Sequence, residues 1–296
     1  MPQRSATPHT DLGPHLDAVV ARLDGRRVRQ NDPIHFVHRY TDRLDQEIAG
    51  IFAVGLAYGR VQLFWPVLEA LFDHLDAHGG PLAFCRDHTL ARGALLHPLT
   101  YRWNRGIDLD VLAAAIGRAL RHHETIEDLF LMGDTTRARL VTGVAELRAH
   151  ALSELAERDV KVTQWSEVSR GLKYLLCSPE SGSACKRWNL YLRWMVRPPT
   201  EAVDLGLWTR WHPRDLIMPV DVHVGRIATL LGLLPKADNR WKTAETLTEA
   251  LRPFAPDDPV RFDFAIAHLG ISSSCRGQRV AEICPSCPLT TVCRAT

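Results

Sequence analysis

Four cysteines near the end of the sequence constrain the fold of this chain more than any other feature. Cys275, Cys284, Cys287 and Cys293 follow the spacing C-x8-C-x2-C-x5-C, so all four lie within nineteen residues. Because the intervening loops are short, four thiolates can meet at one tetrahedral site at a small cost in loop-closure entropy. The spacing therefore predicts that this segment folds around a bound inorganic group.

The same spacing indicates which group is bound. Structural zinc sites typically pair two C-x2-C units across a gap, whereas this segment has one such unit with a single cysteine on either side. A [4Fe–4S] cluster is wider than one zinc ion and suits uneven spacing. Pro285 and Pro288 stiffen the turn around the middle pair. We therefore expect a [4Fe–4S] cluster on the four cysteines and keep zinc as the alternative.

Composition limits the setting in which the chain works. The 296 residues, 46% of them hydrophobic, are enough to bury a core in one or two domains. No apolar run has the length of a signal peptide or a membrane span. We expect a soluble cytoplasmic protein with no membrane partner, and we take it to be a monomer. Since disulfides are rare in a reducing cytosol, Cys85, Cys177 and Cys185 are expected to be small core residues.

The hydrophobic pattern predicts an almost wholly helical chain. Apolar residues recur at intervals of three and four, and no alternating strand pattern recurs. The expected helices cover residues 45–59, 61–80, 109–124, 138–157, 166–177, 184–196, 221–234, 241–254 and 257–270. The first stretch of about 30 residues, rich in Pro, His and Arg, is expected to be a loose arm.

Two motifs together resemble one known superfamily. The cysteine segment is similar to the carboxy-terminal cluster loop of endonuclease III-like DNA glycosylases, which belong to the helix-hairpin-helix superfamily. The last two gaps match, while the first gap is longer here. The segment IMPVDVHVGRIATLLGLL (217–234) resembles the stretch that carries the catalytic aspartate in the superfamily. The resemblance is specific over residues 175–296, and this region also resembles a bacterial family known mainly as a domain of unknown function.

The resemblance implies that Asp221 is the catalytic carboxylate and that His223 contacts a DNA phosphate. The residue-based alternatives are a helix N-cap for Asp221 and a surface histidine for His223. An Asp at a helix start stays ionised because of the helix dipole and the backbone donors. Such a fixed anion can stabilise the cationic sugar that forms as an N-glycosidic bond breaks.

Upstream, the segment LLCSPESGSACKRWNLYL (175–192) corresponds to the superfamily hairpin, although the usual Pro-Gly-x-Gly is absent. The resemblance implies that Gly182 presents backbone N–H groups to a phosphate. It also places the nucleophilic lysine of the bifunctional members at Lys186, with Arg187 supplying a positive setting that favours an amine nucleophile. The alternative is that Lys186 only binds phosphate.

Charge and aromatic content around this region favour a nucleic-acid partner. Between residues 186 and 226, seven Lys and Arg residues outnumber four acidic ones, and Trp188, Trp194, Trp208 and Trp211 are interleaved. Some of these tryptophans are candidates for holding a flipped base, and most are expected in the core. The other residues expected to contact double-stranded DNA are Arg226, Arg276 and Arg279. Residues 55–60 match the helix that contacts the lesion in relatives.

The sequence thus predicts an all-α, two-lobed helix-hairpin-helix glycosylase fold with a carboxy-terminal [4Fe–4S] loop. Residues 1–40 are expected to pack with the last lobe, residues 41–212 to form a helical lobe with the hairpin, and residues 213–296 to form the lobe that carries Asp221 and the cluster. The expected activity is base excision with abasic-site lyase activity, and 8-oxoguanine is the first candidate lesion because the spacer between Lys186 and Asp221 is long, as in archaeal 8-oxoguanine glycosylases. The alternatives are a non-catalytic iron–sulfur nucleic-acid-binding protein and a zinc-stabilised interaction protein.

Overall fold

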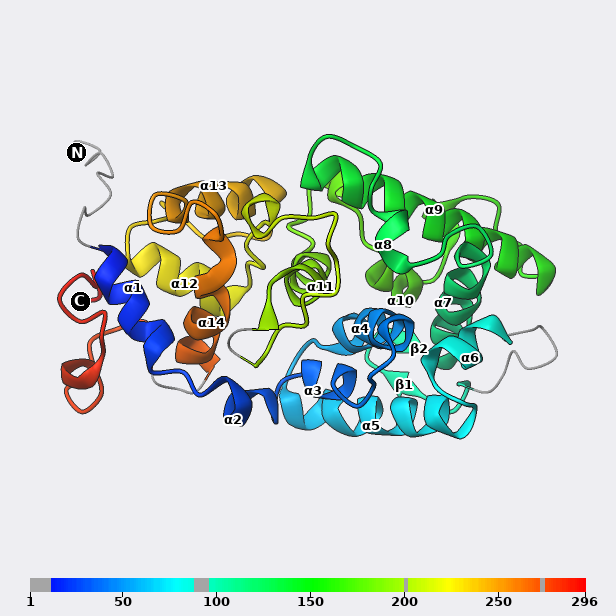
Figure 1. Cartoon of the computed structure of the whole chain (residues 1–296), viewed down its shortest axis with the longest axis horizontal. Helices are drawn as coiled ribbons and strands as arrows, with labels where there is room; N and C mark the ends of the chain where they lie inside the picture. The colour runs from blue at the N-terminus through cyan, green and yellow to red at the C-terminus, as the bar shows by residue number, and fades with distance from the viewer. Residues whose placement is uncertain (1–11, 88–95, 200–201, 272–274) are drawn as a thin grey trace.

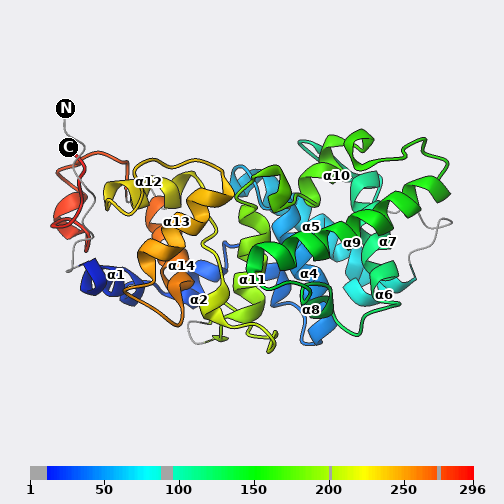
Figure 2. The same cartoon turned by 90° about the horizontal axis from the view of Figure 1, so that it is seen from above.

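The computed structural model describes residues 12–87, 96–199, 202–271 and 275–296. Helices make up almost all of its regular structure, as predicted, and one two-stranded hairpin is the exception. Figure 1 shows the helices in two groups, with α11 between them, and Figure 2 shows the same separation from above. Within the described residues, no helix is long and apolar enough to cross a membrane.

The larger group is a bundle around the apolar helix α4. Its elements are α3 (Ile34–Val37), α4 (Arg43–Leu56), α5 (Val61–Ala77), α6 (Pro81–Arg86), β1 (Thr100–Tyr101), β2 (Asn104–Arg105), α7 (Gly106–Ala119), α8 (Ile126–Leu129), α9 (Thr136–Glu157), η2 (Trp165–Glu167), α10 (Arg170–Leu175), η3 (Pro179–Ser181) and α11 (Lys186–Val196). Helix α7 packs on α9, and α4 packs on α3 and α11. Strands β1 and β2 pair antiparallel.

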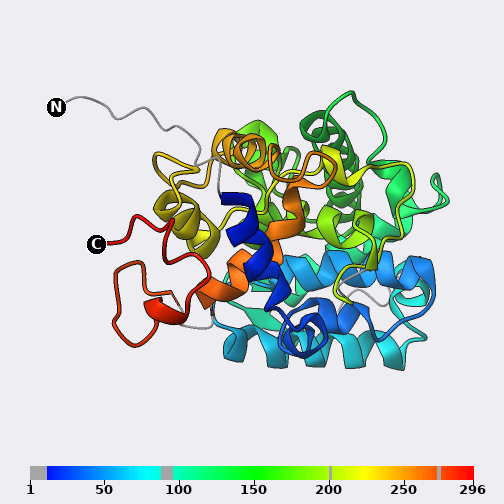
Figure 3. The ribbon, with the colours of Figure 1, turned by 60° about the vertical axis from the view of Figure 1, so that its left-hand side comes forward.

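The smaller group joins the two ends of the chain. Its elements are α1 (Leu12–Ala21), α2 (Gly25–Arg29), η5 (Pro213–Asp215), α12 (Val222–Leu230), α13 (Trp241–Leu251), η6 (Pro259–Phe262), α14 (Asp263–Ile271) and η7 (Cys284–Ser286). Helix α14 packs on both α12 and α1. Figure 3 shows α1 lying against α14, with the cysteine segment beside it.

Helix α4 lies at the centre of the bundle because nearly its whole circumference is apolar. Every residue from Glu47 to Leu56 is buried, a pattern typical of a helix enclosed on all sides. Gly50 lets α11 approach closely, since a Cβ there would lie 2.6 Å from Cε of Met195 and 2.7 Å from Cε2 of Tyr191. The Asp42 side chain accepts hydrogen bonds from two backbone N–H groups and caps the first turn.

The structure corrects two expectations about local structure. Residues 12–29 are not a loose arm, because Leu12, Leu16 and Val19 lie on one face of α1 and are buried. Residues 1–11 of the expected arm lie outside the described residues. The β-hairpin at residues 100–105 was not predicted, since two-residue strands are too short to show an alternating pattern.

The four interleaved tryptophans belong to the core. Trp188, Trp194, Trp208 and Trp211 are each at most 3% exposed. Trp208 also donates from Nε1 to a carboxylate oxygen of Glu47, 2.9 Å away. None of the four is therefore available to hold a flipped base in this conformation, which corrects the expectation that some of them serve that purpose.

A buried ion network ties α11 to α14. Nε of Arg193 lies 3.1 Å from Oδ1 of Asp204, and its Nη1 lies 2.5 Å from Oδ2 of Asp263. Arg197 extends the network, with contacts to Asp204 at 2.5 Å and to Asp258 at 2.9 Å. Buried charges of this kind need their partners, because an unpaired charge in a low-dielectric interior is costly. The network fixes how the end of α11 meets the smaller group.

Candidate functional site

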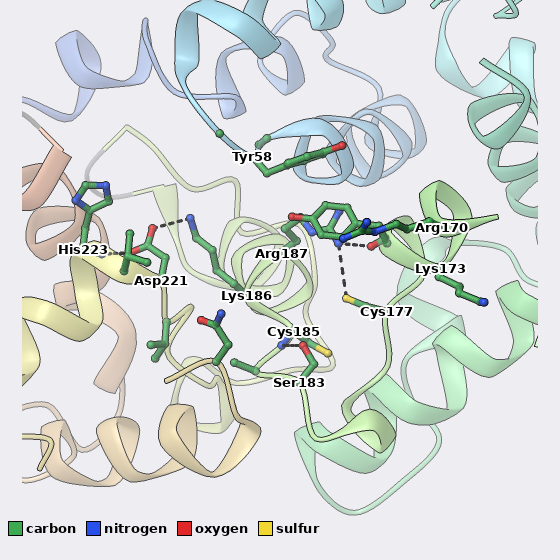
Figure 4. Close-up of a pocket in the computed structure, with 17 residues that line it drawn as sticks. Tyr58, Arg170, Lys173, Cys177, Ser183, Cys185, Lys186, Arg187, Asp221 and His223 are labelled. Carbon is green, nitrogen blue, oxygen red and sulfur yellow. Dashed lines mark hydrogen bonds and ion pairs between the residues drawn. The ribbon is translucent and has the colours of Figure 1, made fainter. Parts of the chain in front are cut away.

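One open pocket lies where the two groups of helices meet. Its volume is about 630 Å³, which falls within the range of about 300–1,000 Å³ usual for ligand sites. Four of the predicted site residues line it, namely Lys186, Arg187, Asp221 and His223. The full lining is Ala57, Tyr58, Gly59, Arg170, Lys173, Tyr174, Cys177, Ser183, Ala184, Cys185, Lys186, Arg187, Val220, Asp221, Val222, His223 and Asn239. Figure 4 shows these side chains.

Lys186 and Asp221 form an ion pair on one side of the pocket. Nζ of Lys186 lies 2.8 Å from Oδ2 of Asp221, although 35 positions separate the two residues in the sequence. The side chains are 36% and 17% exposed, respectively, so both can reach a ligand in the pocket. An amine in contact with a carboxylate combines a nucleophile with a group that can accept its proton.

Asp221 is also the N-cap of α12, so the two interpretations of this residue hold together. Its Oδ1 accepts hydrogen bonds from the N–H groups of His223 and Val224, each at 2.9 Å. Burial by itself would raise the pKa of the Asp221 carboxyl, but the Lys186 ammonium and the backbone hydrogen bonds outweigh burial and lower the pKa below its ordinary 3.8. The carboxylate is therefore ionised at neutral pH.

Acid is expected to remove the contribution of Asp221 to folding stability. A carboxyl with a lowered folded-state pKa stabilises the fold fully above its unfolded-state pKa, and this stability is lost as pH falls through the folded-state value. The difference in unfolding free energy between the wild type and Asp221→Asn should be largest near pH 7 and shrink below about pH 4. Asparagine preserves the N-cap, so the variant isolates the charge. Urea titrations that give a constant difference down to about pH 2.5 would contradict this prediction.

The hairpin loop between α10 and α11 turns at Gly182, whose φ of 77° is in the left-handed region. Its N–H bonds to the Pro179 oxygen at 2.9 Å, and its own oxygen accepts from the Trp241 N–H at 2.8 Å. The Ala184 N–H donates to the Asn239 oxygen at 2.7 Å. The Gly182 N–H is therefore used within the loop, and the Gly182 oxygen and the Ala184 N–H hold the segment before α13; the contact of Gly182 with a DNA phosphate stays a prediction.

Arg187 is a structural clamp. Its Nη1 donates to the Gly55 oxygen at 2.8 Å, and its Nη2 donates to the Tyr174 oxygen. The guanidinium carbon lies 3.6 Å from the centroid of the Tyr174 ring, and Nη2 lies 3.9 Å from the Cys177 sulfur. The side chain is only 9% exposed. Arg187 thus joins the ends of α4 and α10 to α11, which corrects its assignment as a DNA-binding residue.

Tyr58 forms another wall of the pocket. Its hydroxyl donates to Oδ1 of Asn104 at 2.8 Å and lies 3.1 Å from the Tyr101 oxygen, so the β-hairpin fixes the ring. Figure 4 shows Tyr58 at the upper side of the pocket and Ser183 at the lower side, with Lys186 at a level between the two. The sequence singled out residues 55–60 without assigning roles, and the structure adds Tyr58 to the site. A ring face beside an open pocket suits a planar ligand.

Arg170 and Lys173 bring positive charge to the pocket from α10. The guanidinium carbon of Arg170 lies 3.6 Å from the centroid of the Trp103 ring, and Nζ of Lys173 donates to the Ser166 oxygen at 2.5 Å. Neither residue belongs to an ion pair with a carboxylate in the part of the chain that the structure describes. Sequence reasoning missed both residues. Their i,i+3 spacing in the helical segment RGLK was the available signal, because it places them on one helix face.

His223 and Arg226 take different positions relative to the pocket. His223 lines it and packs against Gly270, where a Cβ would lie 2.7 Å from the histidine Cβ. Arg226 donates from Nη2 to the oxygens of Gly270 at 3.3 Å and Cys275 at 2.9 Å. The predicted phosphate contact of Arg226 is therefore corrected, since its guanidinium holds the start of the cysteine segment.

The four cysteines of the tail face one common cavity. Its lining includes Cys275, Cys284, Cys287 and Cys293. Backbone N–H groups point at two of the sulfurs, from Val280 to Cys284 at 3.3 Å and from Ala295 to Cys293 at 3.5 Å. Burial, together with the charges of the other three cysteines, raises the pKa of the Cys287 thiol. The cavity thus brings the four side chains of this segment together, with backbone N–H donors beside two of the sulfurs.

The structure was also searched for side chains placed to hold a single metal ion. Across the described ranges, no group of three or more His, Cys, Asp and Glu side chains has that geometry. His74 and His78, which the sequence pairs near two aspartates, pack ring against ring with centroids 4.5 Å apart. The nearby Asp73 is 3.1 Å from Nη1 of Arg39, so this helix face is built from ion pairs and ring contacts.

Contacts from both ends of the chain brace the cysteine segment. Arg279 donates to the oxygens of Ala295, Thr290 and Cys293 and to the Thr290 hydroxyl. From α1, Nδ1 of His15 lies 2.7 Å from the Pro288 oxygen. The Arg279 guanidinium thus closes the segment on itself while the residue stays exposed, and its contact with DNA stays a prediction. Arg276, the other residue of this segment that was predicted to contact DNA, is exposed. No hydrogen bond of its guanidinium to a carbonyl oxygen is seen among the described residues.

Comparison with known proteins places the chain in a family. The family described as a protein of unknown function, DUF2400, matches residues 32–272. The match covers more than half of the chain, so the protein belongs to this family. It includes the pocket and ends before Cys275. No curated protein and no solved structure matches the chain.

Proposed function

We propose that this protein is a DNA base-excision glycosylase with abasic-site lyase activity. The observation that carries the proposal is the contact of Lys186 with Asp221, 2.8 Å apart, in a pocket of about 630 Å³. The sequence separately identified these two residues as nucleophile and carboxylate. Their meeting in one open pocket supports that assignment, since chemistry at a sugar carbon needs both groups within reach of one atom.

The chemistry follows from the ion pair. Lys186, once it has lost a proton to solvent, attacks the sugar C1′ as the C1′–N bond to the base breaks, and the base leaves with a proton from solvent. Asp221 is anionic while the base departs, so it stabilises positive charge on the sugar, and it accepts a proton from the amine only after the bond to Lys186 has formed. Opening of the sugar ring then gives a Schiff base between Lys186 and C1′, and elimination cleaves the strand. The fixed ring of Tyr58 lines the pocket where the displaced base would lie.

The double-stranded DNA that we propose as partner meets positive charge on the α10 side of the pocket. Replacing Arg170 and Lys173 together by alanine is expected to lower duplex affinity and to reduce the slope of log K against log salt by about 2, because each phosphate contact contributes about 0.9. Fluorescence anisotropy over a salt series measures both quantities. The matched control is Arg121→Ala with Lys161→Ala, two exposed cations outside the pocket lining. Equal slopes for the two double variants would contradict the prediction.

For the tail we propose a [4Fe–4S] cluster held by the four cysteines. Replacing Cys287 by alanine is expected to remove bound iron and visible absorption, because a cluster lacking one ligand is labile. Cys85→Ala, a cysteine buried far from the tail in sequence, should leave both unchanged. Elemental analysis that finds one zinc ion and no iron in the wild type would contradict the cluster and support the zinc alternative.

The experiment that tests the proposed activity is borohydride trapping with the wild-type protein. Duplexes carrying an abasic site or 8-oxoguanine are the first substrates, and an undamaged duplex is the control. A covalent protein–DNA adduct supports the bifunctional assignment. Base release without an adduct would make the enzyme monofunctional, with Asp221 activating water. Salt-dependent duplex binding without base release from any damaged duplex would overturn the proposal in favour of a non-catalytic binding protein.

A further inference from the structure

Two of the cysteines that the sequence assigned to the core also line the pocket: Cys185 is 2% exposed and belongs to the core, and Cys177 packs against it. Cys177 follows α10 by two residues, and Cys185 is the N-cap of α11, directly before Lys186. Both side chains belong to the pocket lining. Figure 4 shows them between Arg187 and Ser183. They stand at the two ends of the hairpin loop, so a bond between them would close that loop.

The surroundings of the two sulfurs make them chemically unequal. The Cys185 thiol donates a hydrogen bond to the Cys177 sulfur, and Arg187 lies 3.9 Å from that sulfur on another side. The contact with Cys185, and the Arg187 charge acting against burial, lower the pKa of the Cys177 thiol to about 6. The same contact, together with burial, raises the pKa of Cys185. The lowered pKa favours the thiolate on Cys177, the raised pKa keeps Cys185 a thiol, and the thiolate is the reactive form.

Backbone hydrogen bonds fix the position of the chain at Cys185. On the residue before Cys185, the Ala184 N–H donates to the Asn239 oxygen at 2.7 Å, and the Ala184 oxygen accepts from Nδ2 of Asn189 at 2.9 Å. Cys185 itself has a φ of 45°, a conformation unusual for a residue with a Cβ. The third cysteine outside the tail, Cys85, is 1% exposed, and burial raises its pKa, so it provides an internal reference for an unreactive thiol.

We propose that Cys177 and Cys185 are a peroxide-reactive pair that closes to a disulfide across the hairpin beside Lys186. In the first step, the Cys177 thiolate attacks one oxygen of hydrogen peroxide, the O–O bond breaks, and a sulfenic acid and hydroxide result. In the second step, the Cys185 sulfur attacks the Cys177 sulfur, the S–S bond forms, and the sulfenic oxygen leaves as water with the thiol proton. The peroxide is the two-electron oxidant. This modification site does not depend on the proposed glycosylase activity.

The test uses the whole, reduced protein and exploits the positions of its lysines. Trypsin cleaves after Lys173 and Lys186, so both cysteines fall in the single peptide 174–186, whereas the tail cysteines fall in peptides 262–276 and 280–294. After treatment with hydrogen peroxide and alkylation of the remaining thiols, peptide 174–186 should carry no alkyl group. It should also be about 2 Da lighter than the dithiol, because two hydrogens are lost. Dithiothreitol should restore both alkylation sites.

Single variants distinguish the attacking from the resolving cysteine. In Cys185→Ser, dimedone should trap a sulfenic acid on Cys177, because the resolving thiol is missing. In Cys177→Ser, dimedone should not label Cys185. The proposal is overturned if peptide 174–186 of the wild type stays fully alkylated at peroxide doses that oxidise the tail peptides. It is also overturned if Cys85 is oxidised as readily, or if Cys177 appears joined to a tail cysteine.

Discussion

Replacing Lys186 by glutamine is expected to abolish the borohydride-trapped adduct and to lower strand cleavage by at least about 1,000-fold, because the variant lacks the amine that we propose forms the Schiff base. Glutamine has a similar length and can still donate a hydrogen bond to Asp221, so the change removes the amine with little effect on packing. The measurement is single-turnover cleavage of an abasic-site duplex, with the adduct followed on a denaturing gel.

Lys173→Gln is the matched control for this prediction. Lys173 lines the same pocket but lies on α10, away from the ion pair, so its variant should keep the adduct. Asp221→Asn should retain the N-cap and the fold while lowering the rate by about 100-fold, since it removes the proton acceptor and the anion. An adduct that persists in Lys186→Gln would assign the nucleophile to another amine.

Arg193→Leu is expected to lower the free energy of unfolding by about 3–5 kcal/mol, because it leaves the buried Asp263 carboxylate without its partner and leaves Asp204 with Arg197 alone. Arg193 is 1% exposed, and its contacts to Asp204 and Asp263 are 3.1 and 2.5 Å long. Burial raises the pKa of the Asp263 carboxyl even with Arg193 present. The variant should therefore lose less stability at about pH 5 than at about pH 7, since the orphaned Asp263 carboxyl takes up a proton as pH falls.

An exposed pair provides the control for this second prediction. Arg252 lies 2.9 Å from Oε1 of Glu249 on the surface of α13, and Arg252→Leu should change stability by less than about 1 kcal/mol. Urea denaturation of both variants measures the difference. If the two variants proved equally stable, the buried network would not be what fixes α11 against α14.

Much of the secondary structure followed from local patterns. The apolar periodicity of residues 138–157 predicted the helix that the structure has at Thr136–Glu157. The expected helix over 45–59 ends earlier, at Leu56, because Ala57 leaves the helical conformation and Gly59 has a φ of 87°. The end of this helix depends on the backbone angles of one or two residues. The pattern of apolar residues therefore does not predict it.

The sequence could not predict which charged residues of the site are available to a ligand. From the sequence alone, Arg187, Arg226 and Arg279 could not be told apart from cations that are free to bind a ligand. In the structure, each donates hydrogen bonds to carbonyl oxygens of the protein. Arg170 and Lys173, which the same reasoning did not assign, face the pocket. Which cation is available to a ligand depends on the carbonyl oxygens within its reach, and these come from distant parts of the chain.

The sequence alone determined the helical class, the grouping of four cysteines in one short segment, and the N-cap at Asp221, because each depends on residues that are neighbours along the chain. Tertiary structure decided that Lys186 and Asp221 meet at 2.8 Å, that Tyr58 joins their pocket, and that Cys177 and Cys185 interact at its edge. These contacts join segments tens of residues apart, or depend on how a loop turns. They form only once burial of apolar surface has brought α4, α10, α11 and α12 together.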